Sequence, residues 1–239
     1  MCDLKNLLIA LIVSIIGVNC FDDNDIESCM KSKHHKGRPG KEDSLHDQCK
    51  GWEKYSCCTK ESTIGAHNEI NHYNFNYNHC PGHKMSDKCR EHFTQDLCFF
   101  DCDPYLKPWI VRVNRTFATE RVFKVPICAD ECIPWWHDCK DDYTCTNNWA
   151  LNFKWINGTN HCPANSQCRP FREIYSEPKE FCEQVWDHSW KYTEDKPCMK
   201  MQFGRGGDNP NKQTAILYAT KAFRATTSAA DSINLKLFY

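Results

Sequence analysis

Cysteines constrain this chain more than any other feature of its sequence. Its 239 residues include 18 cysteines, spread over almost the whole length. Cytosolic thiols are kept reduced, whereas secreted domains convert closely spaced cysteines into disulfides. The sequence therefore predicts a disulfide-rich extracellular domain.

The N-terminal segment, residues 1–20, is typical of a secretory signal peptide. A lysine precedes an apolar run from Leu7 to Val18, which is shorter than a typical transmembrane helix. Its removal eliminates Cys2 and Cys20 and leaves an even number of cysteines, enough for about eight disulfides. These sixteen are Cys29, Cys49, Cys57, Cys58, Cys80, Cys89, Cys98, Cys102, Cys128, Cys132, Cys139, Cys145, Cys162, Cys168, Cys182 and Cys198.

The spacing of the cysteines indicates one domain over residues 21–218. From Cys49 to Cys198 no two successive cysteines are more than 26 residues apart, and no low-complexity linker intervenes. Residues 21–48 are polar, and "KHHKGRPGKEDS" is typical of an exposed loop. After the last cysteine, "GRGGDNPN" predicts turns and "KQTAILYATKAF" favours a short helix, while the tail over 219–239 is expected to be disordered.

Three segments have the apolar spacing of helices. Residues 86–102 carry an apolar stripe that begins after Ser86, a suitable N-cap. Residues 129–142 place cysteines and tryptophans on one face, and residues 179–190 continue such a face to Ser189. With short alternating segments between these helices, the expected fold class is α+β.

The motif search favours no catalytic or metal site. The spacings Cys98-x3-Cys102 and Cys128-x3-Cys132 approach those of zinc ligands, but in a secreted chain they favour disulfides. "LHDQC" at 45–49 is similar to a phospholipase A2 motif, although the order of its parts is reversed and the calcium loop is absent. The net charge of −1 gives no general attraction to nucleic acid. We therefore expect no enzyme activity, no metal and no cofactor.

An alternating aromatic segment and two charged residues are candidates for a binding site. In "NNWALNFKW", Trp149, Leu151, Phe153 and Trp155 would share one face of an extended strand, which forms part of either the core or a pocket for a flat ligand. Asp96, beside the apolar stripe, needs a partner if it is buried, although a helix-surface acid is the ordinary interpretation. Arg121 precedes an apolar run and is usually a solvated charge in such a position.

Two N-glycosylation sequons fit a secreted protein. Asn114-Arg-Thr116 and Asn157-Gly-Thr159 both flank expected loops. We therefore expect a glycan on at least one of Asn114 and Asn157.

Several stretches together resemble the folate receptor family. The similarity runs from about Cys29 to Tyr218 and includes "CMKSKHHKGRPGKEDSLHDQC", "YNFNYNHC", "FTQDLCFFDCDPYLKPWI", "ERVFKVPIC", "WWHDCKDDYTC", "NNW" and "WDHSW". All sixteen mature cysteines have counterparts in that family. The resemblance implies a globular, disulfide-rich domain of several helices and short strands with a deep ligand pocket.

The resemblance also implies roles for individual residues. Asp96 matches the carboxylate that accepts hydrogen bonds from the pterin ring, and Arg121 and Ser189 match groups that donate to it. Tyr73 and Trp186 match the two aromatic residues on either side of the ring, and further wall residues are matched by Phe75, Trp149 and Trp155. These roles suit a flat heteroaromatic ligand, which needs stacked rings and a few fixed polar groups.

Departures from the family pattern remove polar groups from the expected pocket. Ala118 replaces a pterin-facing arginine and Phe117 replaces a tryptophan. In the aromatic segment, Ala150, Leu151 and Phe153 replace histidine, lysine and tryptophan. Phe100 and Trp190 stand where the family has tyrosines. Each missing charged contact is worth roughly 1.5–3 kcal/mol.

The sequence thus predicts a secreted, non-catalytic protein that binds folate or a related pterin more weakly than a high-affinity receptor. One alternative is a protein-interaction module like the egg-surface member Juno, which has lost folate binding. Another is a carrier of riboflavin or a similar ligand. After the small residues "ATTSAAD", the stretch "SINLKLFY" is too short and polar for a glycolipid-anchor signal, which favours secretion unless a longer C-terminus carries one.

Overall fold

The computed structural model describes residues 26–115 and 118–236. The expected signal peptide, residues 1–20, and the candidate wall residue Phe117 lie outside this part of the chain.

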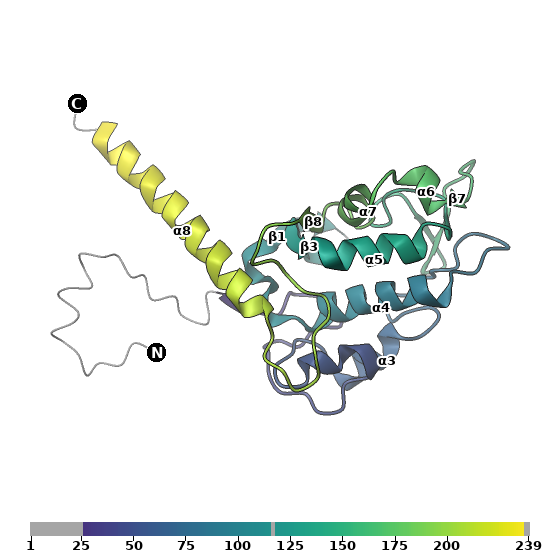
Figure 1. Ribbon diagram of the computed structural model, residues 1–239, viewed down its shortest axis with the longest axis horizontal. Coiled ribbons are helices and arrows are strands. Elements are labelled where there is room, and N and C mark those ends of the chain that lie inside the picture. The colour runs from purple at the N-terminus through teal and green to yellow at the C-terminus, as the bar shows by residue number, and fades with distance from the viewer. Residues whose placement is uncertain (1–25, 116–117, 237–239) are drawn as a thin grey trace.

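Short helices and strands alternate along the described chain (Figure 1). The α-helices are α3 (Lys60–Ala66), α4 (Asp87–Cys102), α5 (Ala129–Cys139), α6 (Phe171–Ile174), α7 (Pro178–Gln184) and α8 (Asn211–Lys236), and the 3₁₀ helices are η1 (Asp47–Trp52) and η2 (Pro104–Trp109). The strands are β1 (Ile110–Arg115), β2 (Ala118–Val122), β3 (Val125–Cys128), β4 (Tyr143–Thr144), β5 (Lys154–Ile156), β6 (Thr159–His161), β7 (Arg169–Pro170) and β8 (Trp190–Thr193). The expected α+β class is confirmed.

The strands of the described residues form four two-stranded sheets. The pairs β1–β2, β4–β7 and β5–β6 are antiparallel, whereas β3 and β8 are parallel. The β3–β8 pairing continues into the preceding loops, where the backbone N–H groups of Lys124 and Val125 donate to the carbonyls of His188 and Ser189. This pairing brings the segment before β8 close to the end of β2.

Helix α4 forms the middle of the domain and packs against η1, α3 and α5. It begins where expected, because the Ser86 hydroxyl accepts a hydrogen bond of 3.3 Å from the backbone N–H of Cys89. Disulfides fix its neighbours: Cys49–Cys98 joins η1 to α4, and Cys89–Cys139 joins α4 to α5. Figure 1 shows α4 and α5 side by side, with α7 beyond α5.

All sixteen cysteines of the expected mature domain are paired. Besides the two pairs above, the disulfides are Cys29–Cys57, Cys58–Cys102, Cys80–Cys168, Cys128–Cys198, Cys132–Cys182 and Cys145–Cys162. The expectation of about eight disulfides is confirmed, and their pairing ties segments that are far apart in sequence.

Two predictions of where helices end were wrong. The helical face expected to reach Ser189 stops early, because α7 ends at Gln184 and Asp187 and His188 adopt left-handed backbone angles, with φ of 54° and 57°. The disordered tail expected over residues 219–239 is also incorrect up to Lys236, since α8 continues to that residue.

Helix α8 starts against the domain and then runs away from it (Figure 1). Its Tyr218 ring lies 5.1 Å from that of Trp109 in η2. Within the described part of the chain, no helix, α8 included, combines the length and the apolar character needed to cross a bilayer.

Candidate ligand-binding site

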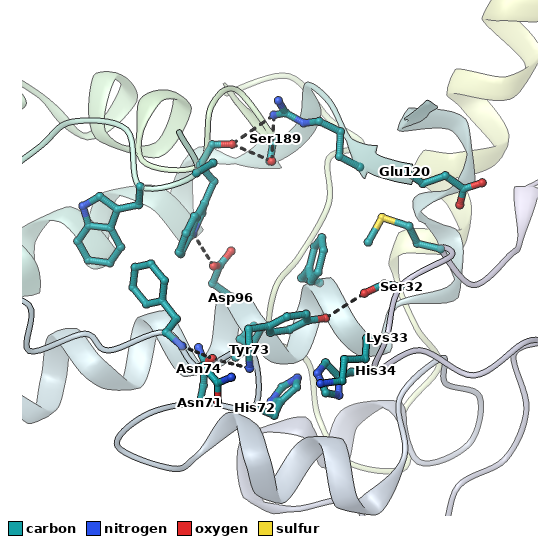
Figure 2. A pocket seen from close by; sticks show the side chains of 18 of the residues that line it. Ser32, Lys33, His34, Asn71, His72, Tyr73, Asn74, Asp96, Glu120 and Ser189 are labelled. Atoms are coloured by element: carbon teal, nitrogen blue, oxygen red, sulfur yellow. Dashed lines mark hydrogen bonds between the residues drawn. The ribbon is translucent and has the colours of Figure 1, made fainter. Parts of the chain in front are cut away.

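A cavity of about 540 Å³ opens beside α4 (Figure 2). Its size falls within the range of small-molecule sites. The described part of the chain includes nine of the ten expected ligand-binding residues, and eight of these nine line the cavity. The eight are Tyr73, Phe75, Asp96, Arg121, Trp149, Trp155, Trp186 and Ser189.

Asp96 is the buried acid of this cavity, and α4 holds it in place. Its Oδ2 accepts a hydrogen bond of 2.8 Å from the indole N–H of Trp186, while its Oδ1 is buried with no hydrogen-bond partner in the described protein. Burial raises the pKa of Asp96 to about 8, against the opposing effects of the Trp186 indole N–H and of the nearby Trp190 indole. An unpartnered buried acceptor is unfavourable, so this carboxyl group favours a ligand that donates to it.

Aromatic rings surround Asp96. The ring of Trp186 lies edge-on to those of Phe75 and Trp149, with centroids 5.5 and 5.6 Å away. The phenol of Tyr73 is fixed by a hydrogen bond of 2.8 Å to Asp101 Oδ1, and burial, reinforced by Asp101, raises the pKa of Tyr73 well above its usual value. Figure 2 shows Tyr73 and Asp96 among the residues that line the cavity. Fixed rings next to one polar acceptor suit a flat heteroaromatic ligand.

Arg121 and Ser189 reach the cavity, but both are bound within the protein. The Arg121 guanidinium donates to Asp187, to backbone carbonyls and to the Ser189 hydroxyl. That hydroxyl in turn donates to the carbonyl of Trp186 over 2.8 Å. The expected donors are therefore present in the cavity wall with their hydrogen bonds largely occupied.

The aromatic segment at residues 149–155 does not form the expected extended face. The side chain of Asn148 accepts hydrogen bonds from the backbone N–H groups of Ala150 and Leu151, which bends the chain into a turn. As a result Trp149 is 2% exposed, whereas Leu151 and Trp155 are 54% and 50% exposed.

The segment contributes to both the core and the cavity. Trp149 stacks on Phe93, with a centroid distance of 4.6 Å and an interplanar angle of 10°, and it also lines the cavity. Phe153 does not line the cavity as expected. It is buried behind it, with its ring 4.7 Å from His79 and 5.6 Å from Phe75. The turn at Asn148 is the reason, because it removes the regular alternation.

Sequence reasoning missed one side of the cavity. Lys33 and His34, from the segment expected to be an exposed loop, line it together with His72. His72 Nε2 lies 2.8 Å from Asp101 Oδ2, and the rings of His34 and His72 are 4.4 Å apart. No local pattern marks these residues, since a disulfide, Cys29–Cys57, determines how the N-terminal segment folds back.

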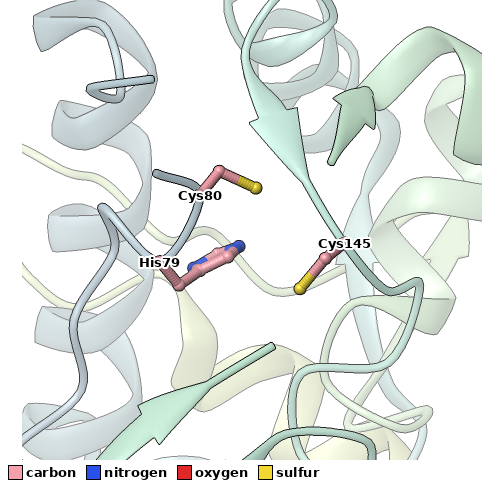
Figure 3. Close-up of side chains that lie close together, drawn as sticks. All are labelled: His79, Cys80 and Cys145. Carbon is pink, nitrogen blue, oxygen red and sulfur yellow. The ribbon is translucent and has the colours of Figure 1, made fainter. Parts of the chain in front are cut away.

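A second cluster has the residue types of a metal site but not the chemistry. His79, Cys80 and Cys145 lie close together (Figure 3). Metals bind cysteine as thiolate, and both sulfurs here belong to disulfides with Cys168 and Cys162. His79 Nε2 is already hydrogen-bonded to Thr144 Oγ1, so this cluster is part of the structural core.

The two expected glycosylation sites are on the surface. Asn157 is exposed in the tight turn between β5 and β6, with φ of 51°, and Asn114 is exposed near the end of β1. Both positions are accessible to a glycan, and their modification stays a prediction.

The fold and the site together define a disulfide-rich domain with an aromatic cavity that contains a buried acid. Comparison with known proteins assigns this domain to a protein family. Residues 28–201 match the model of the folate receptor family. The chain is 41% identical to folate receptor alpha of Bos taurus over 204 residues, covering 83% of this chain and 84% of the relative. It is 40% identical to human folate receptor alpha, covering 80% and 76%. It is also 32% identical to the riboflavin-binding protein of Dromaius novaehollandiae, covering 74% and 72%. The chain belongs to the folate receptor family, as the resemblance predicted.

Proposed function

We propose that this protein binds folate or a related pterin in the cavity beside α4, without chemical conversion. The observation that carries the proposal is the unpartnered, buried Oδ1 of Asp96 within a cavity walled by fixed aromatic rings. A pterin offers a flat ring and N–H donors along one edge, which supplies both of the interactions that this site lacks.

The binding is proposed to be weaker than in a high-affinity receptor. Ala118 and Leu151 replace charged residues of the family pattern. Arg121 and Ser189 donate hydrogen bonds to other groups of the protein. Two missing charged contacts at roughly 1.5–3 kcal/mol each correspond to about two to four powers of ten in affinity.

The same proposal includes secretion. Eight disulfides require an oxidising compartment, and the N-terminal segment and the sequons fit the secretory route. The family relatives are named as receptors and binding proteins, which supports a role in carrying or capturing a vitamin rather than in catalysis.

Tryptophan fluorescence tests the proposal, because Trp149, Trp155 and Trp186 all line the cavity. Protein secreted from animal cells is titrated with folate, pteroate and riboflavin. Folate and pteroate are expected to quench, and Asp96→Asn is expected to weaken both by at least tenfold. The matched control is Asp195→Asn, which alters an exposed carboxylate outside the cavity.

Three other outcomes contradict the proposal. Quenching by riboflavin alone would identify a riboflavin carrier. Absence of quenching by every compound, in a correctly folded protein, would favour a protein-interaction module. Pterin binding that is unchanged in Asp96→Asn would exclude the assigned role of this residue.

A further inference from the structure

The turn between α7 and β8 is bound by the Arg121 side chain, which comes from another part of the molecule. Arg121 in β2 donates through Nη2 to the carbonyl of Trp186 and to the Ser189 hydroxyl, both at 3.3 Å, and also to the carbonyl of Asp187. Its Nε donates to the carbonyl of Val122 over 3.1 Å. The left-handed backbone of Asp187 and His188 turns these oxygens toward the guanidinium.

Asp187 adds the charged partner. Its Oδ2 accepts a hydrogen bond from Arg121 Nη1, and its Oδ1 accepts one of 3.1 Å from the side-chain amide of Asn148. The two charged side chains are only 14% and 18% exposed. At this degree of burial an ion pair is screened less by solvent than a surface pair, so the carboxylate is a strong competitor for the guanidinium.

The arrangement limits what Arg121 offers to a ligand. Each of its three nitrogens already donates to a protein oxygen. The neighbouring Ser189 hydroxyl is occupied as well, since it donates to the carbonyl of Trp186. Nη1 carries a second N–H, but it belongs to the nitrogen that already binds the Asp187 carboxylate. A carbonyl oxygen on a ligand has to share Nη1 with that carboxylate, and a neutral acceptor is the weaker partner.

We propose that Asp187 is a specificity-determining residue, which withholds Arg121 from the ligand so that the cavity recognises donors at Asp96 rather than a ring carbonyl. This inference rests on the proposed function and concerns the same cavity. It predicts that Arg121 does not select a 2-amino-4-oxopteridine over a 2,4-diaminopteridine, which carries an amino group in place of the carbonyl. Arg121 acts instead as a positioning residue, because it binds the turn whose Trp186 donates to Asp96.

The test compares the affinities of pterin and 2,4-diaminopteridine by fluorescence titration, at a fixed, neutral pH where both compounds are predominantly uncharged. The ratio of the two affinities is measured in the wild type, Arg121→Gln and Asp187→Asn. We expect Arg121→Gln to weaken both ligands by a similar factor, so that the ratio changes less than about twofold. Asp187→Asn removes the charged acceptor of Nη1 and is expected to raise the ratio in favour of pterin by about tenfold, the effect of one charged hydrogen bond.

The ratio is informative because a loosened turn lowers both affinities together and leaves it unchanged. The matched control, Asp195→Asn, should alter neither affinity. A tenfold fall of the ratio in Arg121→Gln would overturn the inference, because it would show that Arg121 already binds the carbonyl. An unchanged ratio in Asp187→Asn would overturn it as well. If that variant does not fold, Asp187→Ser removes the same charge, and the Arg121→Gln result stands by itself.

The two proposals fail in different ways. If neither pteridine binds, or if binding does not depend on Asp96, the proposed function is wrong. If both bind through Asp96 but the ratios follow the opposite pattern, only the role of Asp187 is wrong.

Discussion

Replacing Asp96 by asparagine tests the electrostatics of the cavity in the absence of any ligand. Burial raises the pKa of this carboxyl group from 3.8 to about 8 in the folded protein. Between these two values the unfolded chain has released the proton and the folded protein has retained it. Folding stability therefore falls as the pH rises through this window, by about 1.4 kcal/mol per pH unit. Raising the pH from about 5 to about 7 lowers the free energy of unfolding by up to ~2.7 kcal/mol through this group.

Asparagine does not titrate, so the Asp96→Asn variant lacks this contribution. We compare the melting temperature of the variant minus that of the wild type at the two pH values. This difference is expected to increase by roughly 5–11 °C over these two pH units, given the size of the domain. Thermal unfolding followed by circular dichroism, with disulfides intact, measures the difference. Other buried acids with raised pKa values, such as Asp103 and Glu131, occur in both proteins, and their effects cancel in the subtraction. A difference in melting temperature that is the same at both pH values would refute the assigned burial of the charge.

Further predictions concern the ligand, the fold and the glycans. A pterin that donates to Asp96 stabilises its charged form, so binding releases a proton, and affinity should rise by up to about tenfold per pH unit from pH 6 to 8. Calorimetry in buffers of different ionisation enthalpy measures this release. Ala118→Arg combined with Leu151→Lys should tighten folate binding about tenfold by restoring family donors, and no gain by calorimetry would indicate a different ligand. Asp103→Ala should lower the free energy of unfolding by about 1–3 kcal/mol for each buried donor that it leaves unpaired, measured in denaturant titrations. Asp103 accepts hydrogen bonds from the side chains of Trp52, Asn209 and Asn211, and of these Asn211 keeps its bond to the Lys200 carbonyl after the substitution. Asn157→Gln should remove one glycan, seen as increased electrophoretic mobility, and unchanged mobility would show that this sequon is unused.

Local signals predicted the parts of the fold that local interactions determine. Helix α4 was predictable because its cap at Ser86 and its apolar stripe lie within the same segment. The number of disulfides followed from the even count of cysteines that remain after the signal peptide is removed. The pairing of the cysteines did not follow, because it depends on which segments meet in space. The family resemblance predicted the cavity, and eight of its expected residues line it.

Long-range contacts determine the parts that were mispredicted. The apolar spacing in residues 179–190 continues past the end of α7, but Arg121, more than 60 positions earlier in the chain, binds the carbonyls of residues 186 and 187 and stabilises a turn. Asn148 bends the aromatic segment by accepting two backbone hydrogen bonds, and this capping role is not visible in an alternating pattern. In both places a polar side chain overrides the periodicity of the apolar ones.

These two turns explain how a cavity for a flat ligand is built with so little sheet. Of its walls, only Asp96 and its neighbours come from a long helix, whereas Trp186 and Trp149 come from turns. Turns hold a side chain in place only if their backbone is fixed, and here the Arg121–Asp187–Asn148 contacts join both turns. Disulfides close to the turns, Cys132–Cys182 and Cys145–Cys162, further restrict the unfolded chain. The same network that fixes the aromatic walls also occupies Arg121. Rigidity of the walls and a weaker polar contact to the ligand therefore have one structural cause.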